Sequence, residues 1–187
     1  MVSLTALWLP ILLSGVIVFI ASSILHMVLP FHKKDYKKVP GEDKILALMR
    51  EIKVPPGNYV FPCPDNAKHM NTPEMLDKYS KGPVAFLTVM QNGVPNMPKH
   101  LAQWFLYSLL VGVLVAYMAS RTVMAGAEYL AIFRVAGTTA FIAYSIAHIS
   151  NSIWRGDAWS LTFKQIVDGL VYGLLVAGVF AWLWPEM

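Results

Sequence analysis

The chain has 187 residues, of which 56% are hydrophobic and only 14% are charged, with a formal net charge of +4. Because a soluble domain carries about 25% charged residues, this composition argues against a water-soluble protein and favours a membrane protein. In a membrane protein, excess positive charge indicates orientation and attraction to anionic lipid. No nucleic-acid-binding motif is present, so nucleic acid is not expected as a partner.

Four apolar blocks are long enough to cross the hydrocarbon core of a bilayer, which takes about 20 helical residues. They fall at about residues 4–29, 101–119, 129–149 and 163–184. Since backbone groups in lipid must form hydrogen bonds within their own segment, each block is predicted to be a helix. The predicted fold class is therefore an all-α, multi-pass membrane protein, a bundle of four transmembrane helices.

The first apolar block has no basic residue before it, and lysines follow it instead. A cleaved signal peptide has the opposite arrangement and a shorter apolar core, so we interpret this block as a retained span. Residues 1–31 then form the first transmembrane helix, residues 32–100 a cap segment, and residues 101–187 the other three spans. All belong to one membrane domain.

The basic residues predict the orientation of the chain. The segment from His32 to Lys99 holds ten lysines and Arg50, which is 11 of the 15 basic residues. Because cytoplasmic segments of membrane proteins are enriched in lysine and arginine, this segment is predicted to be cytoplasmic, with both termini outside.

Short elements are predicted within the cap segment. Residues 42–52 have apolar side chains at helical spacing and two acids in the first turn, which predicts a helix. Four prolines and a glycine in residues 55–64 forbid a helix there. Residues 72–82 predict a second helix between a capping threonine and a terminating glycine, and residues 84–93 a strand that leads into a turn. The cap is thus expected to mix helical and extended elements.

Small residues recur every four positions in two spans, which allows helices to pack closely in lipid. They are Ser108, Gly112, Ala116 and Ser120 in the second span, and Gly169, Gly173, Ala177 and Ala181 in the fourth. Either both seams are internal and join the second and fourth helices, or one of them faces a sister subunit. The expected partners are membrane lipid and either other membrane subunits or a second copy of the chain.

Four metal-ligating residues lie near the predicted inner ends of four different spans. They are His26, His100, His148 and Asp168. Three imidazoles and a carboxylate at similar depth suit a zinc, copper or iron ion, and two of the histidines could instead hold haem. The alternative is that they are structural polar residues at a wet boundary, with Asp168 paired to Lys164.

The third span has polar residues spaced so that they form one stripe along its predicted helix. The stripe consists of Arg134, Thr138, Ser145, His148 and Ser152. Because charge within a membrane is costly and usually faces a cavity, Arg134, Thr138 and Ser145 form a candidate site for a lipid headgroup, a quinone or a carboxylate. The alternative is that Arg134 reaches outward to Glu128 or lipid phosphate while the hydroxyl groups bond to their own backbone.

The single cysteine, Cys63, excludes an intrachain disulfide. His69 and Met70 follow it, and such soft ligands suit copper, although the spacing matches no strong motif. A buried apolar role, or palmitoylation near the membrane, are the alternatives.

No nucleotide-binding, zinc-protease, serine-hydrolase or paired-cysteine motif is present, so the sequence does not point to an enzyme. The leading hypothesis is a structural or accessory subunit of a larger membrane complex, or a homo-oligomer. The first alternative is a redox protein that binds a metal ion or haem through the inner-face histidines. The second is a small channel, or a bundle that binds lipid or quinone along the third span.

Overall fold

The computed structural model describes residues 2–186. Among them, four helical segments are long and apolar enough to cross a membrane: Leu4–Val28, Met97–Thr122, Tyr129–Arg155 and Trp159–Trp182. This confirms the predicted architecture of four apolar helices. The chain divides into two compact units, one of Met1–Lys37 with Asn96–Met187 and one of Lys38–Pro95.

The first span combines three kinds of helix. It runs from the 3-10 helix η1 (Leu4–Leu7) through α1 (Trp8–Ser23) to a π-helical turn, η2 (Ile24–Val28). A second 3-10 helix, η3 (Pro30–His32), follows directly and starts with a proline, whose fixed φ suits the first helical position. This tight turn folds Pro30–His32 back against the end of the first span.

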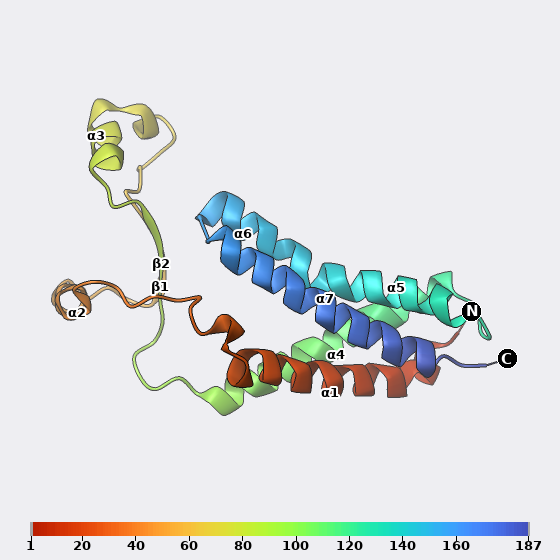
Figure 1. Ribbon diagram of the computed structural model, residues 1–187. Coiled ribbons are helices and arrows are strands. Elements are labelled where there is room, and N and C mark those ends of the chain that lie inside the picture. Colours follow the sequence, from red (N-terminus) through yellow and green to blue (C-terminus); the bar gives the residue numbers. More distant parts are fainter. Residues whose placement is uncertain (1, 187) are drawn as a thin grey trace. The chain divides into compact units, whose positions relative to one another are not determined.

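Three further spans complete the helical unit (Figure 1). They are α4 (Met97–Thr122), then α5 (Tyr129–Phe141) with η5 (Ile142–Ile146) and α6 (Ala147–Arg155), and finally α7 (Trp159–Trp182). Helix α1 packs on α4 and α7, and α5 packs on the same two helices. The order around the bundle is therefore α1, α4, α5, α7.

The small-residue seams are internal, but they do not join α4 to α7. A Cβ atom at Gly173 of α7 would lie 3.1 Å from the carbonyl oxygen of Gly137 in α5. A Cβ atom at Gly112 of α4 would lie 3.2 Å from the carbonyl oxygen of Ile11 in α1. The predicted joint seam is wrong because α4 and α7 are not adjacent in the bundle, so each packs closely on a different neighbour.

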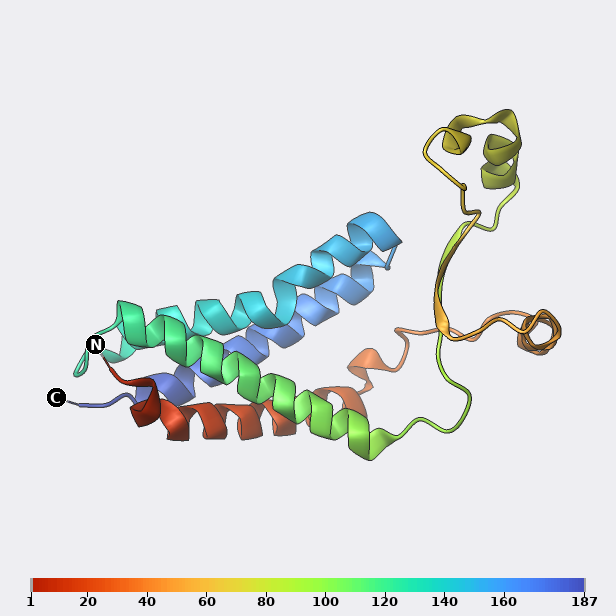
Figure 2. The same ribbon diagram turned by 180° about the vertical axis from the view of Figure 1, so that it is seen from behind.

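The third span is interrupted by a π-helical turn, η5, and changes direction there (Figure 2). A π-helical turn contains an extra residue, so it rotates the following helix relative to the preceding one. Arg134 and Thr138 are exposed on α5, whereas Ser145 and Ser152 are buried. The structure therefore does not bring Ser145 to the face of Arg134 and Thr138, in contrast to the regular stripe that was predicted.

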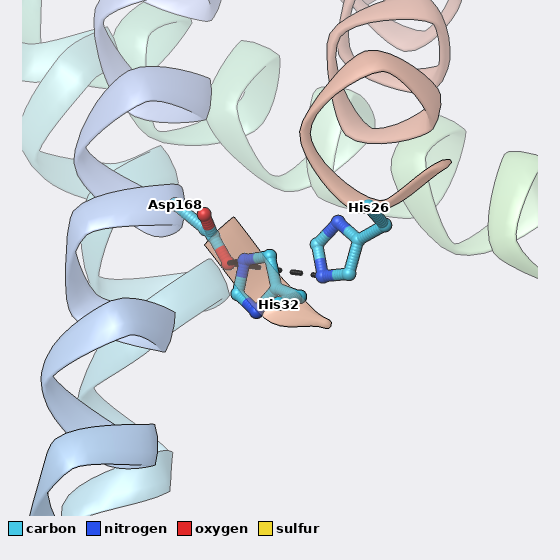
Figure 3. Close-up of side chains that lie close together, drawn as sticks. All are labelled: His26, His32 and Asp168. Atoms are coloured by element: carbon cyan, nitrogen blue, oxygen red, sulfur yellow. Dashed lines mark ion pairs between the residues drawn. The ribbon is translucent and has the colours of Figure 1, made fainter. Parts of the chain in front are cut away.

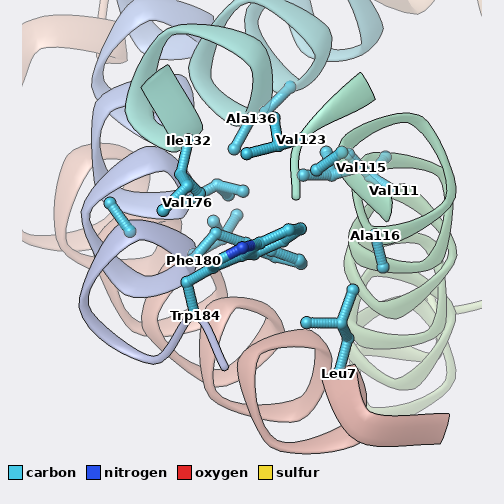
Figure 4. Packing of buried hydrophobic residues seen from close by; sticks show 14 of the residues in the cluster. Leu7, Val111, Val115, Ala116, Val123, Ile132, Ala136, Val176, Phe180 and Trp184 are labelled. Atoms are coloured by element: carbon cyan, nitrogen blue, oxygen red, sulfur yellow. The ribbon is translucent and has the colours of Figure 1, made fainter. Parts of the chain in front are cut away.

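The bundle core near the chain termini is apolar (Figure 4). Phe180 of α7 is fully buried in it, together with Leu7 and Ile132. The Trp184 indole donates a hydrogen bond to the carbonyl oxygen of Met124, 2.8 Å away, which ties the chain end to the connection between α4 and α5. Trp184 is thus a core residue, although its position near a span end is also typical of a lipid-facing anchor.

The unit Lys38–Pro95 contains α2 (Glu42–Glu51), β1 (Gly57–Phe61), α3 (Pro73–Lys81) and β2 (Ala85–Val89). Both predicted helices and the predicted strand are present, and Thr72 caps α3 as expected. Strand β1 was not predicted, since prolines dominate its surroundings. It pairs antiparallel with β2, with Asn58 opposite Thr88. The cytoplasmic location of this unit stays a prediction.

A candidate metal centre at one end of the bundle

Two histidines and one aspartate meet at one end of the bundle (Figure 3). The chain termini lie at the other end (Figure 1). They are His26 of η2, His32 of η3 and Asp168 of α7. One ligand atom from each lies within 4.8 Å of the other two. Because α1 and α7 are neighbours, the end of the first span and the first turns of α7 supply this site together.

His26 is held by the backbone of its own helix. Its Nδ1 atom lies 3.1 Å from the carbonyl oxygen of Ser22. A carbonyl oxygen only accepts hydrogen bonds, so Nδ1 carries the hydrogen and Nε2 of the neutral ring carries a lone pair. That Nε2 atom lies 3.8 Å from Oδ2 of Asp168.

His32 is oriented by Asp35, one turn along the chain. Its Nδ1 atom donates to Oδ2 of Asp35 over 2.6 Å, which again leaves the lone pair of the neutral ring on Nε2. Nε2 lies 3.0 Å from Oδ2 of Asp168, yet the pair lacks hydrogen-bond geometry, and Nε2 is buried without a partner among the described residues. A carboxylate that orients a histidine in this way is the usual support of a metal-ligating imidazole.

The two imidazole rings lie face to face (Figure 3). Their centroids are 4.2 Å apart and their planes differ by 3°. The side chains of His32 and Asp168 are 10% and 6% exposed, whereas that of His26 is 49% exposed. The site is thus closed on the side of α7 and open at His26.

Lys164 neutralises Asp35. Its ammonium group donates to Oδ1 of Asp35 and to the carbonyl oxygen of Phe31, the latter over 2.6 Å. The hydrogen bond from Lys164 lowers the pKa of Asp35; burial opposes this shift and the bond with His32 adds to it. The interpretation in which Lys164 pairs with Asp168 is therefore wrong: Lys164 reaches across to the segment after the first span.

This pairing leaves the charge of Asp168 unbalanced. Asp35 and Lys164 offset each other, and two imidazole lone pairs face the second carboxylate. Oδ1 of Asp168 is buried and has no hydrogen-bond partner in the described part of the chain. Since a buried charge without a counter-charge is strongly unfavourable, the arrangement calls for a cation, either a proton on an imidazole or a metal ion.

Two buried tyrosines lie beyond Asp168, farther inside the bundle. Tyr172 lies one turn beyond Asp168 on α7, and its ring is 5.4 Å from that of Tyr144. Both hydroxyl groups are buried without a partner. Within residues 2–186, the buried side-chain atoms that lack a partner are these two hydroxyls, Oδ1 of Asp168 and Nε2 of His32. Such atoms are rare and usually bind water or a ligand, so their concentration here marks this region for binding.

An apolar cleft of about 410 Å³ opens beside His26, between the end of the first span and the start of α4. Its lining comprises Ser22, Ser23, His26, Met27, Met97, Leu101 and Trp104. The Trp104 indole donates to the hydroxyl of Ser22 over 2.7 Å, which ties the two helices together at the cleft. The open edge of the site thus borders apolar space between two of the apolar helices.

Of the four predicted ligands, the structure brings His26 and Asp168 together. His100 is exposed in the first turn of α4, and His148 is half-buried on α6. Neither belongs to the group around Asp168. His32 and Asp35 were missed because they were assigned to the cap segment; the signal was a histidine and an aspartate three residues apart, with the histidine two residues after Pro30.

Cys63 is exposed, so it is not a buried apolar residue. His69, the proposed co-ligand, instead has its Nδ1 atom 3.2 Å from a carboxylate oxygen of Asp65. The group of potential metal ligands found among the described residues does not include Cys63 or His69.

Comparison of the chain with protein-family models, with curated proteins and with solved structures gave no match.

Proposed function

We propose that the protein is a membrane protein that binds a divalent transition-metal ion through His26, His32 and Asp168. The observation that carries this proposal is that two imidazole Nε2 atoms lie 3.8 and 3.0 Å from one buried carboxylate oxygen. Ligand atoms around a metal ion lie about 3.0–3.5 Å apart when metal–ligand bonds are about 2.1 Å long. Small rotations of the side chains would suffice to centre an ion among them.

Two imidazoles and one carboxylate select the class of metal. This ligand set is used by zinc sites with an open position and by non-haem iron sites, whereas calcium and magnesium prefer oxygen ligands alone. Either metal would keep free positions for water or a further ligand, and the half-exposed His26 gives access to them. The bond from His32 to Asp35 would raise the basicity of its ring as a ligand.

Haem fits this arrangement poorly. Two axial histidines have to approach the iron from opposite faces of the macrocycle. Here the imidazole rings stack 4.2 Å apart, and both present Nε2 to the same carboxylate. A haem could not enter between them without separating the end of the first span from α7.

Metal binding to the full-length chain in detergent tests the proposal. The protein is stripped with a chelator and titrated with Co(II) and Zn(II), followed by absorption spectroscopy and elemental analysis. We expect about one metal ion per chain, and for His32→Ala an affinity lower by about 100-fold or more. The matched controls are His100→Ala and His148→Ala, which should bind like the wild type. Absence of stoichiometric binding, or equal binding by His32→Ala, would contradict the proposal.

A role as subunit of a larger complex or as a homo-oligomer remains a second candidate, and α2 supports it. No residue of α2 is buried, and Ile45, Leu46 and Leu48 are exposed. Exposed apolar side chains on one short helix suit contact with a partner or a membrane surface. Light scattering of the purified protein, corrected for detergent, would measure its mass. If the wild-type protein is monomeric and Leu48→Glu does not change its mass, self-association through α2 is refuted.

A further inference from the structure

A second feature lies on the outward face of α5, toward the end of the bundle that holds both chain termini. Arg134 is exposed there, within the apolar span Tyr129–Arg155. Its guanidinium group has no ion pair or hydrogen bond with any described residue, so the alternative in which Arg134 pairs with Glu128 is not observed. The structure thus presents an unpaired positive charge on a surface of membrane-spanning helices.

The depth of Arg134 makes this charge costly. Arg134 follows the start of α5 at Tyr129 by five residues, which is about 7.5 Å along the helix axis. A guanidinium group does not give up its proton in proteins, so it cannot avoid the cost by becoming neutral. Charged groups at such depth pair with an anion or reach toward the interface.

A groove of about 260 Å³ runs beside Arg134 between α5 and α7. Gly137 and Gly173 form part of its floor, where α5 and α7 approach closely: a Cβ atom at Gly173 would lie 3.1 Å from the carbonyl oxygen of Gly137. Phe141 and Leu170 line its deeper part, while Arg134 and Thr138 are its polar members. Because α5 runs inward from Tyr129, the charged end of the groove lies nearer the end of the span, and its apolar end lies deeper.

We propose that this groove binds one anionic phospholipid. The phosphate would pair with Arg134, whose planar guanidinium group suits bidentate contact with phosphate oxygens. The hydroxyl of Thr138, one helical turn deeper, is placed to donate to the same headgroup, and an acyl chain would lie along Phe141 and Leu170. The polarity of the groove, charged outside and apolar inside, matches that of a lipid in the bilayer.

This site is independent of the proposed metal centre, which lies at the other end of the bundle. Native mass spectrometry of the full chain in detergent tests it, with phosphatidylglycerol, phosphatidylcholine and inorganic phosphate as probes. We expect one phosphatidylglycerol to bind in preference to phosphatidylcholine, and Arg134→Gln to weaken this binding about tenfold. Arg155→Gln, at the opposite end of the same span, is the matched control and should bind like the wild type.

A second variant separates loss of the site from loss of the fold. Thr138→Phe keeps Arg134 but fills the groove, and it should weaken phosphatidylglycerol binding while the protein stays folded by circular dichroism. Equal binding of both lipids by the wild type, or unchanged binding by Arg134→Gln, would overturn the proposal. Binding of inorganic phosphate with the affinity of phosphatidylglycerol would also overturn it, because the site would then recognise a free anion.

Discussion

The chemistry around Asp168 depends on which ring nitrogen of each histidine carries a hydrogen. The backbone carbonyl of Ser22 accepts a hydrogen bond from Nδ1 of His26, and the carboxylate of Asp35 accepts one from Nδ1 of His32, so Nδ1 carries the hydrogen in both rings. Each neutral ring therefore turns a lone pair toward Asp168, and a carboxylate cannot satisfy it. The pKa of Asp35 is lowered, so its ionised form stabilises the folded protein. This contribution to folding stability is fully present when the pH is above the ordinary pKa near 3.8, and it is lost as the pH falls below that pKa.

Replacing the carboxylate by an amide separates binding from stability. In Asp168→Asn, the amide group can donate to an imidazole lone pair and carries no charge, so the metal-free protein should gain about 1 kcal/mol of stability. The same variant should lose the stabilisation that Zn(II) gives to the wild type. Thermal unfolding in detergent, with and without Zn(II), measures both effects. A metal-free variant that is clearly less stable than the wild type would show that Asp168 has a structural role instead.

Between helices, the decisive contacts are those of small residues that allow close approach. A Cβ atom at Gly169 would lie 2.5 Å from the Cβ atom of Ser145, which no real structure tolerates without movement. This contact holds α7 against the π-helical turn η5, and Asp168 is the preceding residue of α7. The position of the candidate metal centre therefore depends on glycine packing at the next residue.

Alanine at two glycines of α7 tests this contact. Gly169→Ala should destabilise the bundle by about 1–3 kcal/mol, because overpacking forces neighbouring atoms to move. Gly178→Ala is the control, since a Cβ atom there would meet only the hydroxyl of Tyr129 at 3.9 Å, an ordinary contact. Thermal or denaturant unfolding in detergent compares the two. Similar losses in both variants would mean that general helix effects, and not the contact with Ser145, determine the result.

For the whole molecule, the orientation in the membrane follows from charge alone. The lysine-rich residues between the first and second spans predict a cytoplasmic location for the unit Lys38–Pro95. This unit contains the single cysteine of the chain, and that cysteine is exposed. Labelling of this single cysteine can therefore report on which side of the membrane the unit lies.

Labelling of Cys63 with a membrane-impermeant maleimide measures the orientation. We expect no labelling in intact cells and full labelling in inside-out membrane vesicles, because the reagent reaches only one side. Cys63→Ser controls for unspecific reaction. Efficient labelling in intact cells would reverse the orientation and place the candidate metal centre at the outer end of the bundle.

The sequence by itself determined the number of spans, their approximate limits and the helices of the unit between residues 38 and 95. These features depend on local composition, periodicity and capping, which a chain carries in its order of residues. It also named His26 and Asp168, because chemistry-bearing residues in apolar spans are rare enough to be noticed.

Only the tertiary structure decided which of the named residues meet. The order of helices around the bundle puts α1 beside α7, so His26 and Asp168 come together while His100 and His148 do not join them. The turn at Pro30 adds His32, and η5 moves Ser145 away from the face of Arg134. Helix order, turns and changes of register arise from contacts between segments far apart in the chain, and no local pattern encodes them.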